Sequence, residues 1–218
     1  MLKRKAKKPR TRPQLDAVSI TAAALAIADR EGLEGLSFRN LARAMDCEAM
    51  SLYHYFPSKA HLLDSMVELY LDEFRWPSET LSWAEQLRLI SHEYRELALR
   101  HPGFYQFISI YRMNSASGLS FLNRVLAVFE GTSLSTELRA RYFRVLGYYL
   151  TGAALDEALG YAKGPTSASP VPSAEAKLHY PAIISVGPFF SVDQHKVTFE
   201  FGLEIFIESV ERMTAMAS

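Results

Sequence analysis

The sequence predicts an all-α protein with an N-terminal three-helix domain and a larger C-terminal helical domain. Apolar residues recur at helical spacing along most of the 218 residues, and glycines and prolines separate one such stretch from the next. No stretch sustains the alternation of apolar and polar residues that a half-buried strand requires. We therefore expect a basic arm over 1–15, a three-helix domain over 16–62 and a helical domain over 63–218.

The charge of the chain is unevenly distributed, although its formal net charge is zero. Residues 1–60 hold 11 lysines and arginines against 6 acidic residues, whereas residues 61–218 hold 13 against 18. A basic end on an otherwise acidic chain is typical of a protein that meets an anionic polymer. A protein that coats DNA without sequence preference would be basic throughout, so the acidic remainder argues against that class.

Composition limits the class of protein further. With 49% hydrophobic residues, the chain can bury a substantial core. No run reaches the roughly 18 consecutive apolar residues of a membrane span, so no membrane partner is expected. Cys47 is the one cysteine, which excludes an internal disulfide and fits the reducing environment of the cytoplasm.

The N-terminal domain begins with a helix that Asp16 can cap and that Gly32 can end. Ser37 then caps a short helix with apolar residues at i, i+3, i+4 and i+7. A break at 46–48 precedes a third helix, Ala49–Tyr55. Two helices joined by a tight turn form a helix-turn-helix motif, whose second helix enters the major groove of DNA.

The start of the third helix suits that groove, which is about 12 Å wide. Residues 49–51 are small enough to approach base edges. Leu52 and Phe56, four positions apart, are expected to face the core. Tyr53 and Tyr55 would then point toward the DNA backbone.

About 45 residues carry a more specific pattern. An alanine-rich helix beginning near Ala22 is followed by Glu31-Gly32-Leu33, Leu36-Ser37-Phe38-Arg39, Leu41-Ala42, Leu52-Tyr53-His54-Tyr55-Phe56, Ser58-Lys59 and Leu62-Leu63. This order resembles that of the tetracycline-repressor (TetR) family. The resemblance implies a dimeric, DNA-binding transcriptional regulator.

The resemblance also implies which residues meet DNA. Arg39 would reach a phosphate or a guanine edge, the start of the third helix would read bases, and the two tyrosines and Lys59 would contact phosphates. The predicted contacts within the motif are Arg39, Ala49, Met50, Ser51, Tyr53, Tyr55 and Lys59.

A basic run precedes the first helix. From Lys3 to Arg12 the chain has seven cations and no acid. Its position favours an arm that reaches phosphates or the minor groove, and a merely solvated tail is the alternative. The predicted contacts from this arm are Lys8, Arg10 and Arg12.

The turn departs from the family pattern at two positions. Asp46 stands where the family usually has glycine, and aspartate tolerates the left-handed backbone conformation better than most residues. Cys47 replaces a small apolar residue. It is expected to be a buried core thiol, with a redox switch as the alternative.

Helical patterns continue beyond the motif. Ser82 and Glu85 have capping-box spacing at the start of one helix. The expected helices lie at about 58–76, 83–100, 104–113, 117–130, 135–161 and 192–216. Residues 163–190 hold five of the ten prolines and are predicted to form a partly mobile surface loop.

The C-terminal domain is expected to bind an unknown small-molecule effector, mostly apolar or aromatic. Ligand pockets are usually apolar cavities with a few polar groups, and the middle helices supply both kinds of residue. Any single member of the set can equally be plain core. The candidate lining is Trp83, His92, Tyr94, Phe104, Gln106, Phe107, Ile108, Tyr111, Phe121, Phe129, Tyr148 and Asp156.

The long helix and the last helix each carry apolar residues on two faces. Such a helix must bury both faces, one in its own core and one against a partner subunit. The resemblance implies a four-helix interface of a homodimer, and a two-fold dimer reads a palindromic operator. The predicted interface residues are Leu146, Leu150, Ala153, Phe199, Leu203, Phe206 and Val210, with Phe201 and Ile205 off the main stripe.

No catalytic, metal or cofactor signature is visible in the sequence. The six histidines form no i, i+4 pair on one helix, and there is no cysteine cluster, Gly-rich phosphate loop or nucleophile elbow. We therefore expect no enzyme, no metal site and no cofactor, with a metal-bound effector as an alternative. The leading hypothesis is a repressor that a ligand releases from its operator, and an activator or effector-independent regulator is the alternative.

Overall fold

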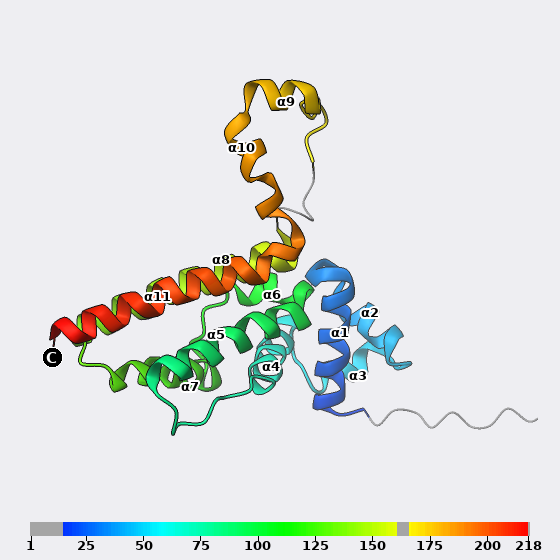
Figure 1. Cartoon of the computed structure of the whole chain (residues 1–218). Helices are drawn as coiled ribbons and strands as arrows, with labels where there is room; N and C mark the ends of the chain where they lie inside the picture. Colours follow the sequence, from blue (N-terminus) through cyan, green and yellow to red (C-terminus); the bar gives the residue numbers. More distant parts are fainter. Residues whose placement is uncertain (1–14, 161–165, 218) are drawn as a thin grey trace, which may run out of the picture. The chain divides into compact units, whose positions relative to one another are not determined.

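The computed structural model describes residues 15–160 and 166–217, and the chain divides into two compact units, Met1–Leu69 and Tyr70–Ser218 (Figure 1). Within the described residues the secondary structure is helical and contains no strand. The all-α prediction is therefore confirmed. The border between the units falls inside the fourth helix, whereas the sequence placed it at 62/63, in the first turn of that helix.

The first unit contains the three predicted N-terminal helices and the start of a fourth. Asp16 caps the first helix, because its carboxylate accepts a hydrogen bond from the backbone N–H of Ser19 at 2.7 Å. Ser37 caps the second helix by accepting from the N–H of Asn40 at 3.1 Å. The helices of the first unit are α1 (Ala17–Gly35), α2 (Phe38–Ala44), α3 (Ala49–Tyr53) and the start of α4 (Lys59–Asp72).

Gly32 bends α1 close to its end. Its φ of 69° lies in the left-handed region, which a residue with a side chain adopts only with strain. The helix thus changes direction at the glycine that the sequence marked as its end, and a short helical stretch continues to Gly35. Helices α3 and α4 both end earlier than predicted, at Tyr53 and Asp72.

The second unit is a bundle in which α5 packs on α8, and α8 also packs on α11 (Figure 1). The predicted capping box is present at the start of α5, where Ser82 and Glu85 bond to each other's backbone N–H groups. The bundle consists of α5 (Trp83–Arg100), α6 (Pro102–Ile108), α7 (Ala116–Val128), η1 (Phe129–Gly131), α8 (Thr136–Leu159) and α11 (His195–Ala217). No helix among the described residues is long and apolar enough to cross a membrane.

A glycine sets the distance between α8 and α11. A Cβ atom at Gly202 would lie 2.7 Å from ring atoms of Tyr149, so any larger residue would push the helices apart. The Tyr149 hydroxyl donates a hydrogen bond to the carbonyl of Phe199, across the same contact. This close approach fixes which faces of the two helices are buried.

Two arginines of α5 tie it to its neighbours. The guanidinium of Arg95 pairs with Glu157 of α8, with Nε 2.6 Å from Oε2. The guanidinium of Arg88 pairs in the same two-pronged way with Glu204 of α11, at 2.7 and 2.8 Å. The pair at Arg95 is largely buried, whereas the pair at Arg88 is half-exposed.

The prediction of a loop over 163–190 is wrong for most of that segment. Residues 163–165 lie outside the described residues, but helices α9 (Ser173–His179), α10 (Pro181–Val186) and η2 (Gly187–Phe190) follow. Pro181 and Pro188 sit in the first turns of their helices, where a missing N–H costs nothing. These short elements pack mainly on one another and are exposed.

The predicted interface stripe on the last helix is also wrong. Phe199, Leu203, Phe206 and Val210 are buried within their own chain, and so are Leu146 and Leu150 of α8, while Ala153 is half-buried. Both stripes of α11 are apolar, so spacing alone could not say which one faces inward.

A different stripe of α11 is exposed. Val197, Phe201 and Ile205 recur every four residues and are 60%, 69% and 53% exposed. Val145 and Tyr148 are exposed on the neighbouring α8. Phe201 and Ile205, which were predicted to lie off the main stripe, are thus exposed and available for a partner.

Candidate DNA-binding face and ligand cavity

The turn between α2 and α3 has the geometry that the motif requires. Asp46 adopts a φ of 53°, which confirms that aspartate takes over the usual role of glycine here. The N–H of Cys47 donates to the carbonyl of Ala42 at 3.0 Å and closes the turn. Cys47 itself is half-buried, and its pKa is raised by burial and by the carboxylates of Glu48 and Asp46. A thiol that stays protonated reacts slowly, which argues against a redox switch.

The third helix presents its predicted face. Leu52 and Phe56 are buried in the core of the first unit, as expected. Met50 is 71% exposed, and Ala49 and Ser51 are half-buried beside it. An exposed apolar side chain at the start of a recognition helix is free to contact base edges and thymine methyl groups.

The two tyrosines of the motif are exposed but anchored. The ring of Tyr53 stacks on Phe38 of α2, with centroids 4.5 Å apart and planes at 12°. The Tyr55 hydroxyl donates to the carbonyl of Leu15 at 2.7 Å, just before α1 begins. Anchored rings approach a backbone with little loss of side-chain freedom, which suits phosphate contacts.

Lys59 has a structural role that sequence reasoning missed. Its ammonium donates to the carbonyls of Leu33 and Leu36, at 3.2 and 2.8 Å, just beyond the kink in α1. The side chain is also exposed, and an ammonium has three donors, so one donor is left over. Replacing Lys59 would disturb α1 as well as any phosphate contact.

Arg39 offers a cleaner test of the DNA-binding face, since it is exposed near the start of α2. We expect Arg39→Ala to weaken operator binding and, if the contact is to phosphate, to reduce the salt slope by about 1. Fluorescence anisotropy across a salt series measures both quantities. The matched control is Arg30→Ala, which removes an exposed arginine paired with Glu31 on α1. Equal affinities for wild type and both variants would contradict the assignment of the face.

Lys8, Arg10 and Arg12 lie outside the described residues, so their predicted contacts with DNA stay predictions.

The second unit holds a cavity of about 800 Å³ between α5, α7 and α8. Five residues of the predicted lining border it, and most of its wall was not predicted. The predicted members are Tyr94, Ile108, Tyr111, Phe121 and Tyr148. The others are Ile90, Ser109, Met113, Leu122, Val125, Leu126, Ala140, Phe143, Arg144, Leu146, Gly147, Leu150, Thr151 and Gly152.

A chain of hydroxyl groups lies in the wall. The Tyr105 hydroxyl donates to the Tyr94 hydroxyl at 2.9 Å, and that oxygen lies 3.2 Å from Oγ1 of Thr151. Burial raises the pKa of Tyr105 well above its ordinary value, so the phenol stays neutral. Tyr94 and Thr151, which both border the cavity, give its apolar wall two hydroxyl groups.

The remaining predicted lining residues do not border this cavity. Phe104 and Phe129 are fully buried core, and Gln106 is exposed. The ring of Phe107 contacts that of Tyr111, with centroids 5.2 Å apart and planes at 47°. His92 faces α11, with Nε2 3.3 Å from Oε2 of Glu200.

Trp83 borders a separate hollow of about 560 Å³ together with Trp76 and Arg124. The guanidinium carbon of Arg124 lies 4.2 Å from the centre of the Trp76 ring. Ile90 contributes to the walls of both this hollow and the large cavity.

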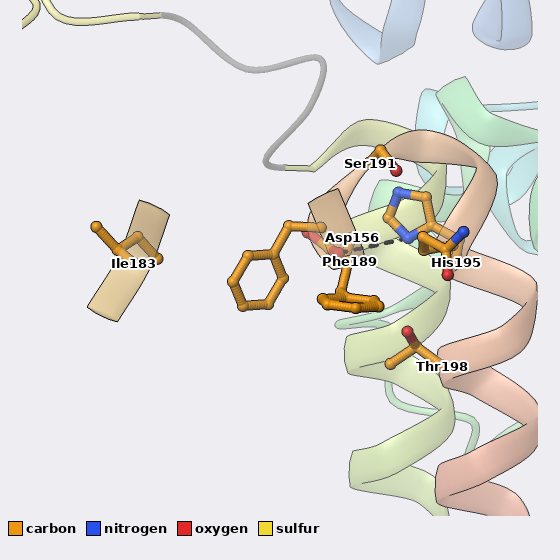
Figure 2. A pocket seen from close by; sticks show the side chains of 8 residues that line it. Asp156, Ile183, Phe189, Ser191, His195 and Thr198 are labelled. Carbon is orange, nitrogen blue, oxygen red and sulfur yellow. Dashed lines mark ion pairs between the residues drawn. The ribbon is translucent and has the colours of Figure 1, made fainter. Parts of the chain in front are cut away.

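Asp156 lies in a further hollow, of about 390 Å³, at the start of α11. Figure 2 shows its carboxylate beside the imidazole of His195, and Oδ2 is 3.6 Å from Nδ1. Phe189 of η2 and Thr198 of α11 border the same hollow. The residue predicted as a polar handle for the ligand is therefore placed elsewhere.

Potential metal ligands do not gather in the described part of the chain, where no group of three or more His, Cys, Asp or Glu side chains could hold an ion.

Comparison with known proteins decides the family. Residues 20–66 match the family model of bacterial regulatory proteins, tetR family, and residues 76–214 match the tetracyclin repressor-like C-terminal domain. The chain belongs to the TetR family. It is 29% identical to the HTH-type transcriptional repressor DrrR1 of Streptomyces coeruleorubidus, over 94% of this chain and 80% of that protein.

Solved structures of TetR proteins agree with this fold. A structure described as a possible TetR family transcriptional regulator from Streptomyces coelicolor A3(2) superposes with a TM-score of 0.74 at 24% identity, covering 91% of this chain and 100% of the other. ActR from Streptomyces coelicolor, in complex with actinorhodin, superposes with a TM-score of 0.71 at 26% identity, covering 92% and 99%. As a TetR protein, this chain is a transcriptional regulator and not an enzyme.

Proposed function

We propose that this TetR protein is a homodimeric repressor, which a small and mostly apolar or aromatic molecule releases from its operator. The observation that carries the proposal is the cavity of about 800 Å³, whose size is within the usual range for a ligand pocket. Its wall combines aliphatic and aromatic side chains with a few hydroxyl groups. DrrR1 is a repressor by name, and ActR has been crystallised with actinorhodin, which supports both halves of the proposal.

The DNA-binding half of the proposal uses the exposed face of the motif. Helix α3 would enter the major groove with Ala49, Met50 and Ser51 at base edges, while Tyr53 and Tyr55 meet phosphates. One helix of this length reads few base pairs. Two copies related by a two-fold axis would read a palindrome with half-sites roughly one helical turn apart.

The dimer would form through the exposed apolar residues of α8 and α11. Val197, Phe201 and Ile205 line one face of α11, and Val145 lies on α8. Large apolar side chains exposed on two neighbouring helices are typical of a protein interface. Pairing these helices with those of a second copy would bury it.

The coupling between ligand and operator would pass through α4, which begins in the first unit and ends in the second. A ligand that fits only one arrangement of α4 changes the spacing of the two recognition helices. By linkage, operator and ligand must weaken each other's binding by the same factor, typically worth about 1–3 kcal/mol.

The test fills the cavity. A Cβ at Gly147 would meet no atom within 4 Å, so a large side chain can extend from this position without strain at its root. The operator is first selected from a random DNA pool, and a metabolite library is then screened for release. We expect Gly147→Trp to keep operator affinity within about twofold and to need at least about tenfold more of the ligand for release, because the indole occupies the ligand's space.

The matched control is Gly187→Trp, at a position that is equally open but lies outside this cavity. It should respond to ligand as the wild type does. The proposal of a ligand-released repressor fails if Gly147→Trp is released normally. It also fails if calorimetry finds the same ligand affinity with and without operator, which would favour an effector-independent regulator.

A further inference from the structure

The cavity wall carries a single charge among the described residues that border it. That charge is the guanidinium of Arg144 on α8, and no Asp, Glu, Lys or His side chain lines the cavity with it. Arg144 is also exposed, so it lies where the cavity opens to solvent. An arginine remains protonated at any physiological pH, so the mouth of the cavity is positively charged.

Unlike several arginines of the same unit, Arg144 has no acidic partner among the described residues. Arg88, Arg95 and Arg141 each lie within 3 Å of a glutamate oxygen. No carboxylate oxygen of the described residues comes within 4.0 Å of the Arg144 guanidinium. The sequence of α8 offers no partner on the same helix. Positions 140, 141, 147 and 148, one turn to either side on α8, hold no acid.

A neighbouring tyrosine holds the guanidinium in place. Nη1 of Arg144 donates to the hydroxyl of Tyr148 at 3.3 Å, and the guanidinium carbon lies 5.9 Å from the centre of that ring. Tyr148 borders the same cavity. These contacts orient the group but do not neutralise it, and most of its five N–H donors stay available.

We propose that the cavity selects aromatic ligands that carry an acidic group, and that the guanidinium of Arg144 binds this group at the mouth. This inference rests on the ligand cavity proposed above. The rings would lie against apolar side chains such as Phe121 and Phe143, while a carboxylate or sulfonate pairs with Arg144 through two parallel hydrogen bonds. A cationic ligand of the same shape would be repelled and would lose its hydration without compensation.

Two fluorescent probes of the same shape separate charge from apolar contact. Anilinonaphthalene sulfonate is anionic, and N-phenylnaphthylamine has the same rings without the sulfonate. We expect Arg144→Gln to weaken binding of the anionic probe by about tenfold and to leave the neutral probe within about twofold, since the charge-assisted bonds are lost and the apolar contacts are kept. Added salt should weaken binding of the anionic probe more in the wild type than in Arg144→Gln, because the Arg144 guanidinium is exposed and its charge is screened.

The control variant is Arg141→Gln, which removes an exposed arginine from the preceding turn of α8, paired with Glu137 and outside the cavity wall. It should bind both probes as the wild type does. Gly147→Trp reports whether the probes occupy the cavity, and it should remove both of them.

The outcomes separate the two proposals. If Gly147→Trp leaves both probes bound, the cavity is not their site, and both the ligand cavity and the role of Arg144 are overturned. If Gly147→Trp removes both probes but Arg144→Gln weakens both equally or neither, the cavity stands and the selection of acidic ligands is overturned. Equal effects of Arg141→Gln and Arg144→Gln on the anionic probe would overturn it as well, by showing a general effect of surface charge.

Discussion

Replacing Phe201 with glutamate is expected to turn the proposed dimer into monomers and to lower operator affinity by about 100-fold or more. Linking two DNA-binding domains raises the affinity for DNA by roughly two to four orders of magnitude over that of one domain. A monomer loses this gain. Sedimentation at micromolar concentration measures the assembly, and anisotropy with the selected operator measures the affinity. Both readouts should change together.

The expectation follows from where Phe201 lies. The side chain is 69% exposed in the single chain, so glutamate at this position is solvated in the monomer and should not unfold it. In a dimer through α11, the same carboxylate would be enclosed by apolar residues from two subunits. Burying an unpaired charge costs far more than an interface of this kind can offset.

A matched control separates the interface from general surface chemistry. Ile110 is 83% exposed and lies outside α8 and α11, so Ile110→Glu makes the same chemical change elsewhere in the unit. It should sediment as the wild type does. A dimeric Phe201→Glu variant would show that the exposed stripe of α11 is not the interface. Leu203→Glu would not discriminate, because a buried glutamate there would unfold the chain.

The first unit could be predicted closely from the sequence because its signals are local. Ser37 and Asp16 predict helix starts because their side chains can cap a helix. Asp46 predicts a left-handed turn because aspartate tolerates a positive φ. Leu52 and Phe56 face the core because one short helix has one apolar face. None of these inferences needed to know what lies next to the motif.

The bundle was harder to predict because its helices are apolar on more than one face. Periodicity finds the stripe of Phe199 and Leu203 and the stripe of Phe201 equally well. The choice between them depends on Gly202, which draws one face onto Tyr149 of α8. Such a contact between residues about fifty positions apart has no local signal.

The wall of the cavity shows the same limit. Aromatic content pointed to Phe104 and Phe129, which fill the core, while the cavity is bordered by residues such as Gly147 and Thr151. A cavity forms where the side chains of packed helices leave space between them. Composition shows which side chains are present but not where such a space remains. One signal was readable, namely the absence of acidic neighbours around Arg144 along its helix.

The prediction of a loop over 163–190 was wrong for a different reason. The five prolines in 163–190 predict a loop, because proline usually interrupts a helix. Pro181 and Pro188 instead occupy helix starts, where a fixed φ favours the first turn. Proline density therefore marks short elements as well as loops, and only the position within each element distinguishes them.

Breaking the buried ion pair of the bundle is expected to have the largest effect on stability. Arg95→Met should lower the free energy of unfolding of the second unit by about 3–5 kcal/mol, because it leaves the Glu157 carboxylate in the interior without its main counter-charge. The side chain of Arg95 is 8% exposed and that of Glu157 is 17% exposed. The guanidinium also lies 5.6 Å from the ring of Phe199 on α11, so the loss reaches a third helix.

The double variant Arg95→Met/Glu157→Leu tests the reason for that loss. If an uncompensated charge is the cause, removing both charges should recover much of the stability, since apolar residues of similar volume often replace a buried pair at little cost. The exposed pair of Arg141 and Glu137, also on α8, provides the control, and Arg141→Met should cost no more than about 1 kcal/mol. Urea unfolding followed by circular dichroism measures all four proteins. A double variant as unstable as Arg95→Met alone would show that lost packing around the arginine stem, and not the stranded carboxylate, is what destabilises the bundle.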